Sequence, residues 1–276
     1  MAHSFTSIHH SLERLQEAEY FLCRLITTNG LYFAFDLNAF LSASRSVTFV
    51  LQRELSDVPA FQSWYQRRSG EMKSDSEMEF FKNLRNISQK RGPVAYVGGA
   101  RYGGGYSARF LRSEAQIPPR LVERDIAEAC AEHLKKLASL LLGCYEALPF
   151  HCCMAGALSV EGMDALGYTL EDVETALGLP KGWTDVGGNE IPLDARLNLL
   201  KREIEPLDLG ELDRLAAGKF QHDGVPLSIQ RDGGPEFLDY IANKVNNDPN
   251  LLNNGRALFI GAILERIKET DPDQET

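Results

Sequence analysis

The sequence predicts a mostly α-helical protein with one short β-hairpin, and three observations lead to this fold class. Apolar residues recur at helical spacing along several long windows of the chain. Gly92-Pro93 and Pro118-Pro119 divide these windows where helices must end. Only residues 93–112 combine alternating strand-like runs with glycine clusters, which is typical of a hairpin.

The first two helices are predicted from their apolar stripes. The first stripe consists of Ile8, Leu12, Leu15, Leu22, Leu25 and Ile26. It should end near Asn29-Gly30, a helix C-terminal signal. A second, more buried helix is expected over residues 33–55, where Leu37, Leu41 and Leu51 lie on a core stripe.

The other face of this second helix carries polar residues. Asn38, Ser42, Arg45 and Phe49 are spaced at i, i+4, i+7 and i+11, so they share one side. Polar groups on an apolar helix face water, pair internally or line a pocket. Two interpretations stay open: Arg45 pairs with an acid inside the bundle, or Asn38 and Ser42 line a pocket.

Three further elements complete the first half. A third helix should begin at Pro59, and residues 69–77 are interpreted as a polar break. A fourth helix should begin at Ser76 and end at Gly92-Pro93, because proline cannot continue a helix. After the hairpin, a long helix is expected from about residue 120 to residue 148.

Charge divides the chain into two regions. Residues 1–155 hold 18 Lys or Arg and 16 Asp or Glu, whereas residues 156–276 hold 11 and 23. We therefore expect an N-terminal helical bundle over 1–155, with a Gly-rich hairpin at 93–112. Residues 156–276 should form a smaller, acidic, loop-rich helical region, whose acids either recruit a partner, mask a basic site or keep the region soluble.

The acidic region has its own helix signals. Thr169 and Asp172 resemble a capping box at the start of a short helix. Short helices are expected near 194–203 and 210–217, and two closing helices over 235–247 and 256–269. The Thr169 helix also resembles the first helix and turn of a helix-turn-helix. Because no basic recognition helix follows, DNA reading is not expected.

The composition of the chain bears on its cellular location and on its need for a metal or cofactor. No apolar run approaches the roughly 20 residues of a membrane helix, and the first residues lack the pattern of a secretory signal. The five cysteines are odd in number and lack the paired spacing of a metal site, which favours reduced core thiols. We expect a cytoplasmic protein with no membrane contact, no metal and no cofactor.

Several conventional catalytic motifs are missing from the sequence. It contains no GxxxxGK[ST] phosphate loop, no HExxH and no GxSxG elbow, and its glycine clusters do not fit GxGxxG. Cysteine–histidine catalysis has no local signature here. Any chemistry must therefore come from another arrangement of side chains.

The segment from Lys82 to Arg112 is the most informative part of the chain. It contains seven basic residues and no Asp or Glu, although the whole protein has a net charge of −10. Four aromatic residues are interleaved with the basic ones, namely Tyr96, Tyr102, Tyr106 and Phe110. Basic charge attracts phosphate and aromatic faces stack on unpaired bases, so this segment predicts binding of single-stranded RNA.

The helical pattern and Arg85-Asn86 near the end of the fourth helix resemble the HEPN superfamily. Ribonucleases of that superfamily are helical bundles with a motif of Arg, a polar residue, three to four residues and His. Here Arg85 and Asn86 occupy the first two positions, and Lys90 occupies the position of the histidine. Histidine moves protons near its pKa of about 6.5, whereas free lysine, at about 10.4, stays charged.

This resemblance implies a specific set of site residues and partners. Arg85, Asn86 and Lys90 would be catalytic, Asn38 and Ser42 would line the pocket, and a base would come from His9, His10 or elsewhere. RNA would be bound by Arg45, Arg91, Arg101, Tyr102, Tyr106 and Arg109. The resemblance also implies a homodimer and, if the protein is an enzyme, a metal-independent endoribonuclease.

The sequence is compatible with three functions. The first is a HEPN-like RNA-binding protein, a weak or inactive ribonuclease of a prokaryotic defence or toxin–antitoxin system. The second is a helical dimeric scaffold whose acidic C-terminal half recruits a protein partner. The third is an enzyme of small nucleotides whose phosphates are held by Arg45, Arg85 and the hairpin.

Overall fold

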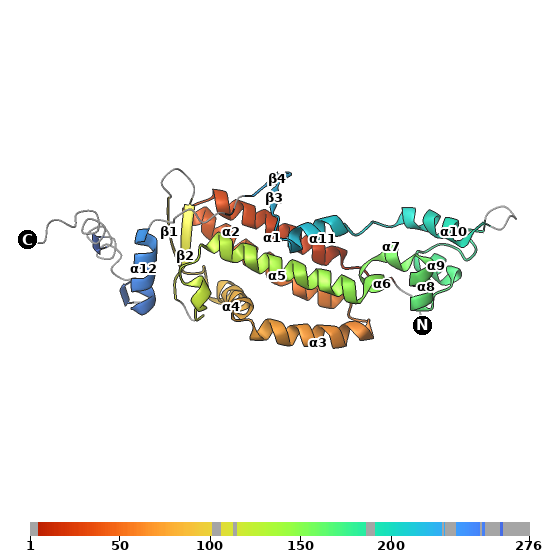
Figure 1. Ribbon diagram of the computed structural model, residues 1–276, viewed down its shortest axis with the longest axis horizontal. Coiled ribbons are helices and arrows are strands. Elements are labelled where there is room, and N and C mark those ends of the chain that lie inside the picture. The colour runs from red at the N-terminus through yellow and green to blue at the C-terminus, as the bar shows by residue number, and fades with distance from the viewer. Residues whose placement is uncertain are drawn as a thin grey trace, which may run out of the picture. The chain divides into compact units, whose positions relative to one another are not determined.

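The computed structural model describes residues 5–100, 106–112, 115–185, 191–227, 229, 236–248, 250–251 and 260–261. It confirms the predicted fold class, because these residues are mostly helical with a short antiparallel hairpin (Figure 1). The predicted closing helix over 256–269 lies outside the described residues, apart from 260–261. Among the helices that are described, none is long and apolar enough to cross a membrane.

Five helices of 16 or more residues and one hairpin dominate the first half of the chain. The helices are α1 (His9–Thr27), α2 (Gly30–Glu54), α3 (Pro59–Ser74), α4 (Ser76–Arg91) and α5 (Ile126–Ala147). The hairpin pairs β1 (Tyr96–Ala100) with β2 (Tyr106–Phe110), with Gly98 opposite Ala108.

The rest of the described chain consists of shorter elements. The helices are α6 (Pro149–Cys152), α7 (Met154–Ala157), α8 (Val160–Leu166), α9 (Leu170–Ala176), α10 (Leu193–Leu200), α11 (Leu209–Ala216) and α12 (Glu236–Asn247). Two 3₁₀ turns, η1 (Pro119–Leu121) and η2 (Lys201–Glu203), and a two-residue ladder of β3 (Gln221–His222) with β4 (Val225–Pro226) complete them.

Two predicted boundaries are wrong, for local reasons. The polar break expected over 69–77 is helical through Ser74, because Gly70 costs a helix only about 1 kcal/mol and no proline follows it. The side chain of Asp75 then accepts hydrogen bonds from the backbone of Glu77 and Met78 and starts α4. The long helix begins at Ile126 rather than near residue 120, after the 3₁₀ turn and Asp125.

The chain forms two compact units, each assembled from three separate segments. The first unit contains residues 1–15, 46–70 and 136–217, and the second contains 16–45, 71–135 and 218–276. Both predicted regions, 1–155 and 156–276, contribute to each unit. The division expected from charge therefore does not coincide with the division into compact units.

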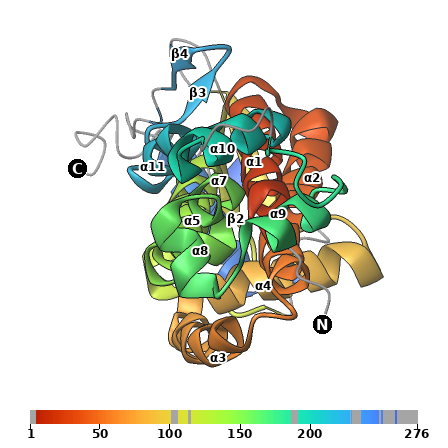
Figure 2. The same ribbon diagram turned by 90° about the vertical axis from the view of Figure 1, so that its right-hand side faces the viewer.

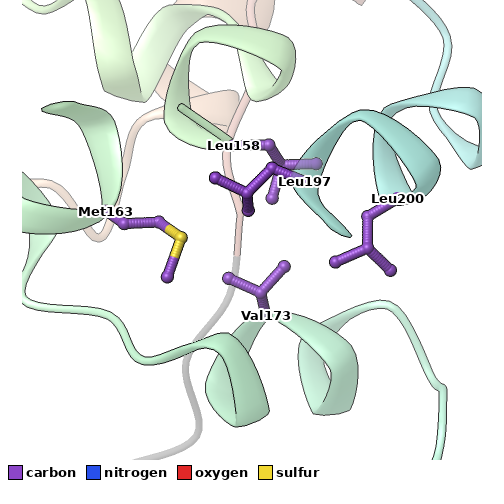
Figure 3. Packing of buried hydrophobic residues seen from close by; sticks show 5 residues of the cluster. All are labelled: Leu158, Met163, Val173, Leu197 and Leu200. Atoms are coloured by element: carbon purple, nitrogen blue, oxygen red, sulfur yellow. The ribbon is translucent and has the colours of Figure 1, made fainter. Parts of the chain in front are cut away.

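In the first unit, a small apolar core joins the short helices α8, α9 and α10 (Figure 2). Its five buried side chains point toward one another in Figure 3: Leu158, Met163, Val173, Leu197 and Leu200. Tyr168 packs against this core and meets the ring of Phe5 edge-on at 5.5 Å. The predicted capping box of Thr169 and Asp172 is present at the start of α9.

A buried carboxylate fixes the turn that follows α9. Glu174 accepts hydrogen bonds from the backbone of Gly182 and Thr184 and from the Thr184 hydroxyl, at 2.5–2.8 Å. Burial alone would raise the pKa of Glu174. The hydrogen bonds from Thr184 and Gly182 and the charge of Arg196 outweigh burial and hold the pKa below its ordinary value.

In the second unit, aromatic rings join α2, α4, α5 and the hairpin. Phe81 of α4 stacks on His133 of α5 at 4.2 Å and meets Phe40 of α2 at 6.4 Å. Phe110 of β2 meets Phe80 edge-on at 5.1 Å. The long helices are therefore held together by large, fully or nearly buried side chains.

Helix α12 covers the hairpin in the second unit, as Figure 1 shows. Leu111, Ala242 and Val245 form a buried cluster, and Val97 and Ile241 pack against it. Asn246 accepts a hydrogen bond from the backbone of Arg112 at 2.5 Å. The hairpin thus packs against residues more than 120 positions later in the chain.

Replacing Gly162 by alanine should destabilise the protein. A Cβ there would lie 2.4 Å from the carbonyl oxygen of Gly156 and 2.7 Å from that of Ala157. We expect a loss of about 1–3 kcal/mol in the free energy of unfolding, measured with urea. The control is Gly143→Ala in α5, where the nearest atom is 4.0 Å away and no loss is expected. Equal stability of both variants would contradict this packing.

The hydrogen bonds that Glu174 accepts from Gly182 and Thr184, here called the Glu174 clamp, should make the stability of the protein sensitive to acid. Because the folded pKa lies below the ordinary value of 4.5, the stabilisation is present above pH 4.5 and is lost as the pH falls through the folded value. Glu174→Gln should cost about 1–3 kcal/mol at pH 7 and remove this part of the pH dependence in urea unfolding. The exposed Glu171→Gln is the control, and a similar pH profile for wild type and Glu174→Gln would contradict the clamp.

Candidate functional site

The polar stripe predicted on α2 meets α4 in the second unit. Gln89 of α4 donates a hydrogen bond to the hydroxyl of Ser42 at 3.3 Å. Phe40 and Phe81 bring the same two helices together in the core. The structure therefore places Ser42 beside the helix that carries Arg85, Asn86 and Lys90, with Asn38 one turn earlier on α2.

Arg85 of α4 and Asn38 of α2 each have one polar atom without a hydrogen-bond partner in the described part of the chain. These atoms are the Nε of Arg85 and the Oδ1 of Asn38, and both are buried. One is a donor and the other is an acceptor. Buried polar atoms are nearly always satisfied in folded proteins, so these two atoms mark hydrogen-bonding capacity on α2 and α4 that the described residues leave unused.

Local sequence explains why α4 presents these residues. Met78, Phe80, Phe81 and Leu84 are buried and fix the orientation of the helix. Arg85 and Asn86 follow directly and are half-buried, whereas Lys90 and Arg91 in the last turn are exposed. On α2, Ser42 and Arg45 are half-buried on the stripe. Along α4 the polar side chains of the site therefore become more exposed, from Arg85 and Asn86 to Lys90 and Arg91.

Arg109 has a structural position. Its side chain is 5% exposed, donates to Asp239 at 2.7 Å and lies 3.5 Å from a carboxylate oxygen of Asp125. Asp125 also accepts hydrogen bonds from the Ser107 hydroxyl and the Ala108 backbone. This network ties β2 to the start of α5 and to α12, and it withdraws the Arg109 charge from solvent. The structure does not present Arg109 to an RNA ligand.

Tyr106 is also held inside an aromatic group. Its ring lies 5.2 Å from Phe33 and covers Gly98, where a Cβ would be 2.2 Å from the Tyr106 hydroxyl. Tyr96 lies 5.0 Å from Phe33 and donates to the carbonyl of Gly30 at 2.8 Å. Burial and the neighbouring Tyr106 raise the pKa of Tyr96 to about 12. Arg101 and Tyr102 lie outside the described residues.

The two histidines considered as a base, His9 and His10, lie in a different compact unit from Arg85 and Asn86. His10 lies 2.8 Å from a carboxylate oxygen of Glu13, whose hydrogen bond raises the pKa of His10. His9 lies 3.6 Å from Glu13 and 3.5 Å from Glu205. Both histidines belong to the first unit, whereas Arg85 and Asn86 belong to the second. The residues after α9 form the Glu174 turn through Thr184, not a recognition helix.

The cysteines are free and buried in the described structure. The sulfur atoms of Cys144 and Cys152 lie 3.6 Å apart, while Cys23 donates to the carbonyl of Gln221. Within the described ranges, no three His, Cys, Asp or Glu side chains gather as a metal site requires. The thiols therefore contribute to the core, as their apolar surroundings indicate.

One exposed apolar group was not anticipated. Leu31, Tyr32 and Phe35 lie at the start of α2 and are 66%, 67% and 54% exposed. The helix predicted over residues 33–55 leaves out Leu31 and Tyr32, because α2 starts at Gly30. A signal was present, because Leu31 and Phe35 continue the spacing of Asn38 and Ser42 toward the N-terminus.

Fold and site together define a helical protein with a polar and basic face shared by α2 and α4. Residues 17–147 are similar to the family described as bacteriophage lambda protein ea47. This span includes α2, α4, the hairpin and α5. Neither a curated protein nor a solved structure matches the chain. The resemblance to the HEPN superfamily stays a prediction.

Replacing Arg109 should affect folding rather than only binding. Arg109→Ala leaves the buried Asp125 without its cation, and removing one partner of a buried ion pair costs about 3–5 kcal/mol. Urea unfolding of the full chain measures this loss. Arg112→Ala, three residues after Arg109 and at an exposed position, should leave stability nearly unchanged. A stable Arg109→Ala protein would contradict the structural role.

Proposed function

We propose that this chain is a cytoplasmic RNA-binding protein that holds single-stranded RNA on the face shared by α2 and α4. The observation that carries the proposal is the unpaired, buried pair of Arg85 Nε and Asn38 Oδ1. A phosphate oxygen accepts from a guanidinium, and a ribose 2′-hydroxyl donates to an amide oxygen. Because Arg85 and Asn38 are only half-buried, a ribose-phosphate backbone that reached these side chains would meet a group of each kind.

Charge around the site supports the same ligand. Lys90 and Arg91 are exposed at the end of α4, and no acid lies between Lys82 and Arg112 in the sequence. Lys82 itself is held by Glu79 on the same helix. Exposed Lys and Arg attract phosphates along the strand and make binding sensitive to salt.

Nuclease activity should be weak or absent. RNA cleavage without a metal requires a group that exchanges protons near neutral pH, and lysine stands where HEPN ribonucleases carry histidine. Arg85 and Lys90 would stabilise phosphate charge, with Asn86 beside them. A role in a prokaryotic defence or toxin–antitoxin system is part of this proposal and rests on the HEPN resemblance alone.

RNA binding by variants of α4 tests the proposal. The double variant Arg85→Ala with Lys90→Ala should weaken binding of a single-stranded RNA, measured by fluorescence anisotropy at about 50 and 200 mM salt. Each lost phosphate contact should reduce the slope of log affinity against log salt by about 0.7. Lys82→Ala is the matched control on the same helix, because Glu79 already neutralises that lysine.

Two outcomes would contradict the proposal. The proposal would be contradicted if the wild-type protein showed no salt-sensitive affinity for RNA. Equal weakening by Lys82→Ala and by the double variant would show that charge anywhere on α4 suffices. Gel analysis of the same RNA after incubation should show intact strands, and rapid cleavage that Asn86→Ala abolishes would restore the ribonuclease assignment.

A further inference from the structure

The exposed apolar residues at the start of α2 continue the polar stripe of the proposed site. Leu31, Phe35, Asn38 and Ser42 are spaced at i, i+4, i+7 and i+11 and therefore lie on one side of α2. Tyr32 adjoins them, and its ring lies 6.4 Å from that of Phe35. The aromatic end and the polar middle form one continuous strip of a single helix.

Folding does not account for these three side chains. The core side of the same helix is formed by Phe33, Leu37, Phe40 and Leu41, each at most 2% exposed. Leu31, Tyr32 and Phe35 are all more than half exposed. Contiguous exposed apolar side chains of this size are typical of interaction sites.

The carboxylate in the first turns of α2 is already paired. The acid nearest to these residues in the sequence, Asp36, is 5% exposed and is bound by Arg24 at 2.7 Å and by Thr28 at 3.0 Å. The aromatic end of α2 therefore presents no free carboxylate from its own first turns. This pairing lowers the repulsion that a strand of phosphates would meet from the first turns of α2.

The basic end of α4 lies within reach of the aromatic residues. Tyr96 holds the carbonyl of Gly30, the first residue of α2. Tyr96 is five positions after Arg91, which limits the separation of their Cα atoms to about 18 Å. Figure 1 shows the hairpin beside the start of α2. The exposed Lys90 and Arg91 and the exposed rings thus lie at one end of the second unit.

We infer that Leu31, Tyr32 and Phe35 form a stacking platform for unpaired bases of the strand whose phosphates α4 binds. This inference rests on the proposed function and adds the class of RNA, a strand with accessible base faces. The rings of Tyr32 and Phe35 are inclined by 84°, so each can receive a separate base. Duplex RNA keeps its bases stacked on one another and should bind less well.

A set of three RNA probes of equal length tests this platform. The probes are a single strand of mixed sequence, the same backbone with abasic positions, and a hairpin duplex. Wild-type protein should prefer the single strand over both others in fluorescence anisotropy. Tyr32→Ala and Phe35→Ala should each lose about 5- to 150-fold in affinity for the single strand and little for the abasic backbone.

Matched variants separate stacking from general damage. Tyr32→Phe keeps the ring and should retain affinity. Trp183→Ala removes another exposed aromatic, 40% exposed in the first unit, and should have no effect. Arg85→Ala should weaken binding of the single strand and binding of the abasic backbone equally, because it removes a phosphate contact.

The outcomes distinguish this inference from the proposed function. If Arg85→Ala weakens RNA binding but Tyr32→Ala and Phe35→Ala do not, the stacking platform is overturned. The proposal that the protein binds RNA would still stand. Absence of RNA binding by wild type would overturn both. Unchanged RNA affinity with a loss of self-association in Phe35→Ala, measured by light scattering, would assign the surface to a second copy of the chain and overturn the inference.

Discussion

The contact of Phe81 with His133 and Phe40 is the interaction on which the site depends. It fixes α4 against α5 and α2, at ring distances of 4.2 and 6.4 Å. Arg85 lies one helical turn after Phe81, and Asn38 lies two residues before Phe40. A loss of this packing would detach α4 from α2 and α5 and so remove the arrangement of the proposed site.

The basic segment separates into two roles in the structure. Arg109 lies in an interior network with Asp125 and Asp239, which attaches the hairpin to α12. Lys90 and Arg91, at the end of α4, stay exposed. The number of basic residues counted along the sequence is therefore larger than the number available to a ligand. Similarly, Tyr96 and Tyr106 are used for packing around Phe33, whereas Tyr32 is exposed.

The helices of the first half could be predicted because their apolar spacing and their proline and glycine signals are local. The stripe of Asn38, Ser42 and Arg45 could be predicted for the same reason. The burial of Arg109 could not, because its partner Asp239 lies 130 positions later in the chain. The assembly of each unit from three segments likewise depends on tertiary contacts that local patterns do not contain.

Photochemical crosslinking followed by mass spectrometry tests the central claim most directly. The full chain would be irradiated with a single-stranded RNA that carries 4-thiouridine at every uridine position. The α2–α4 site predicts crosslinks within residues 31–45 and 85–91. Crosslinks confined to other elements, or none at all under conditions where RNA is bound, would contradict it.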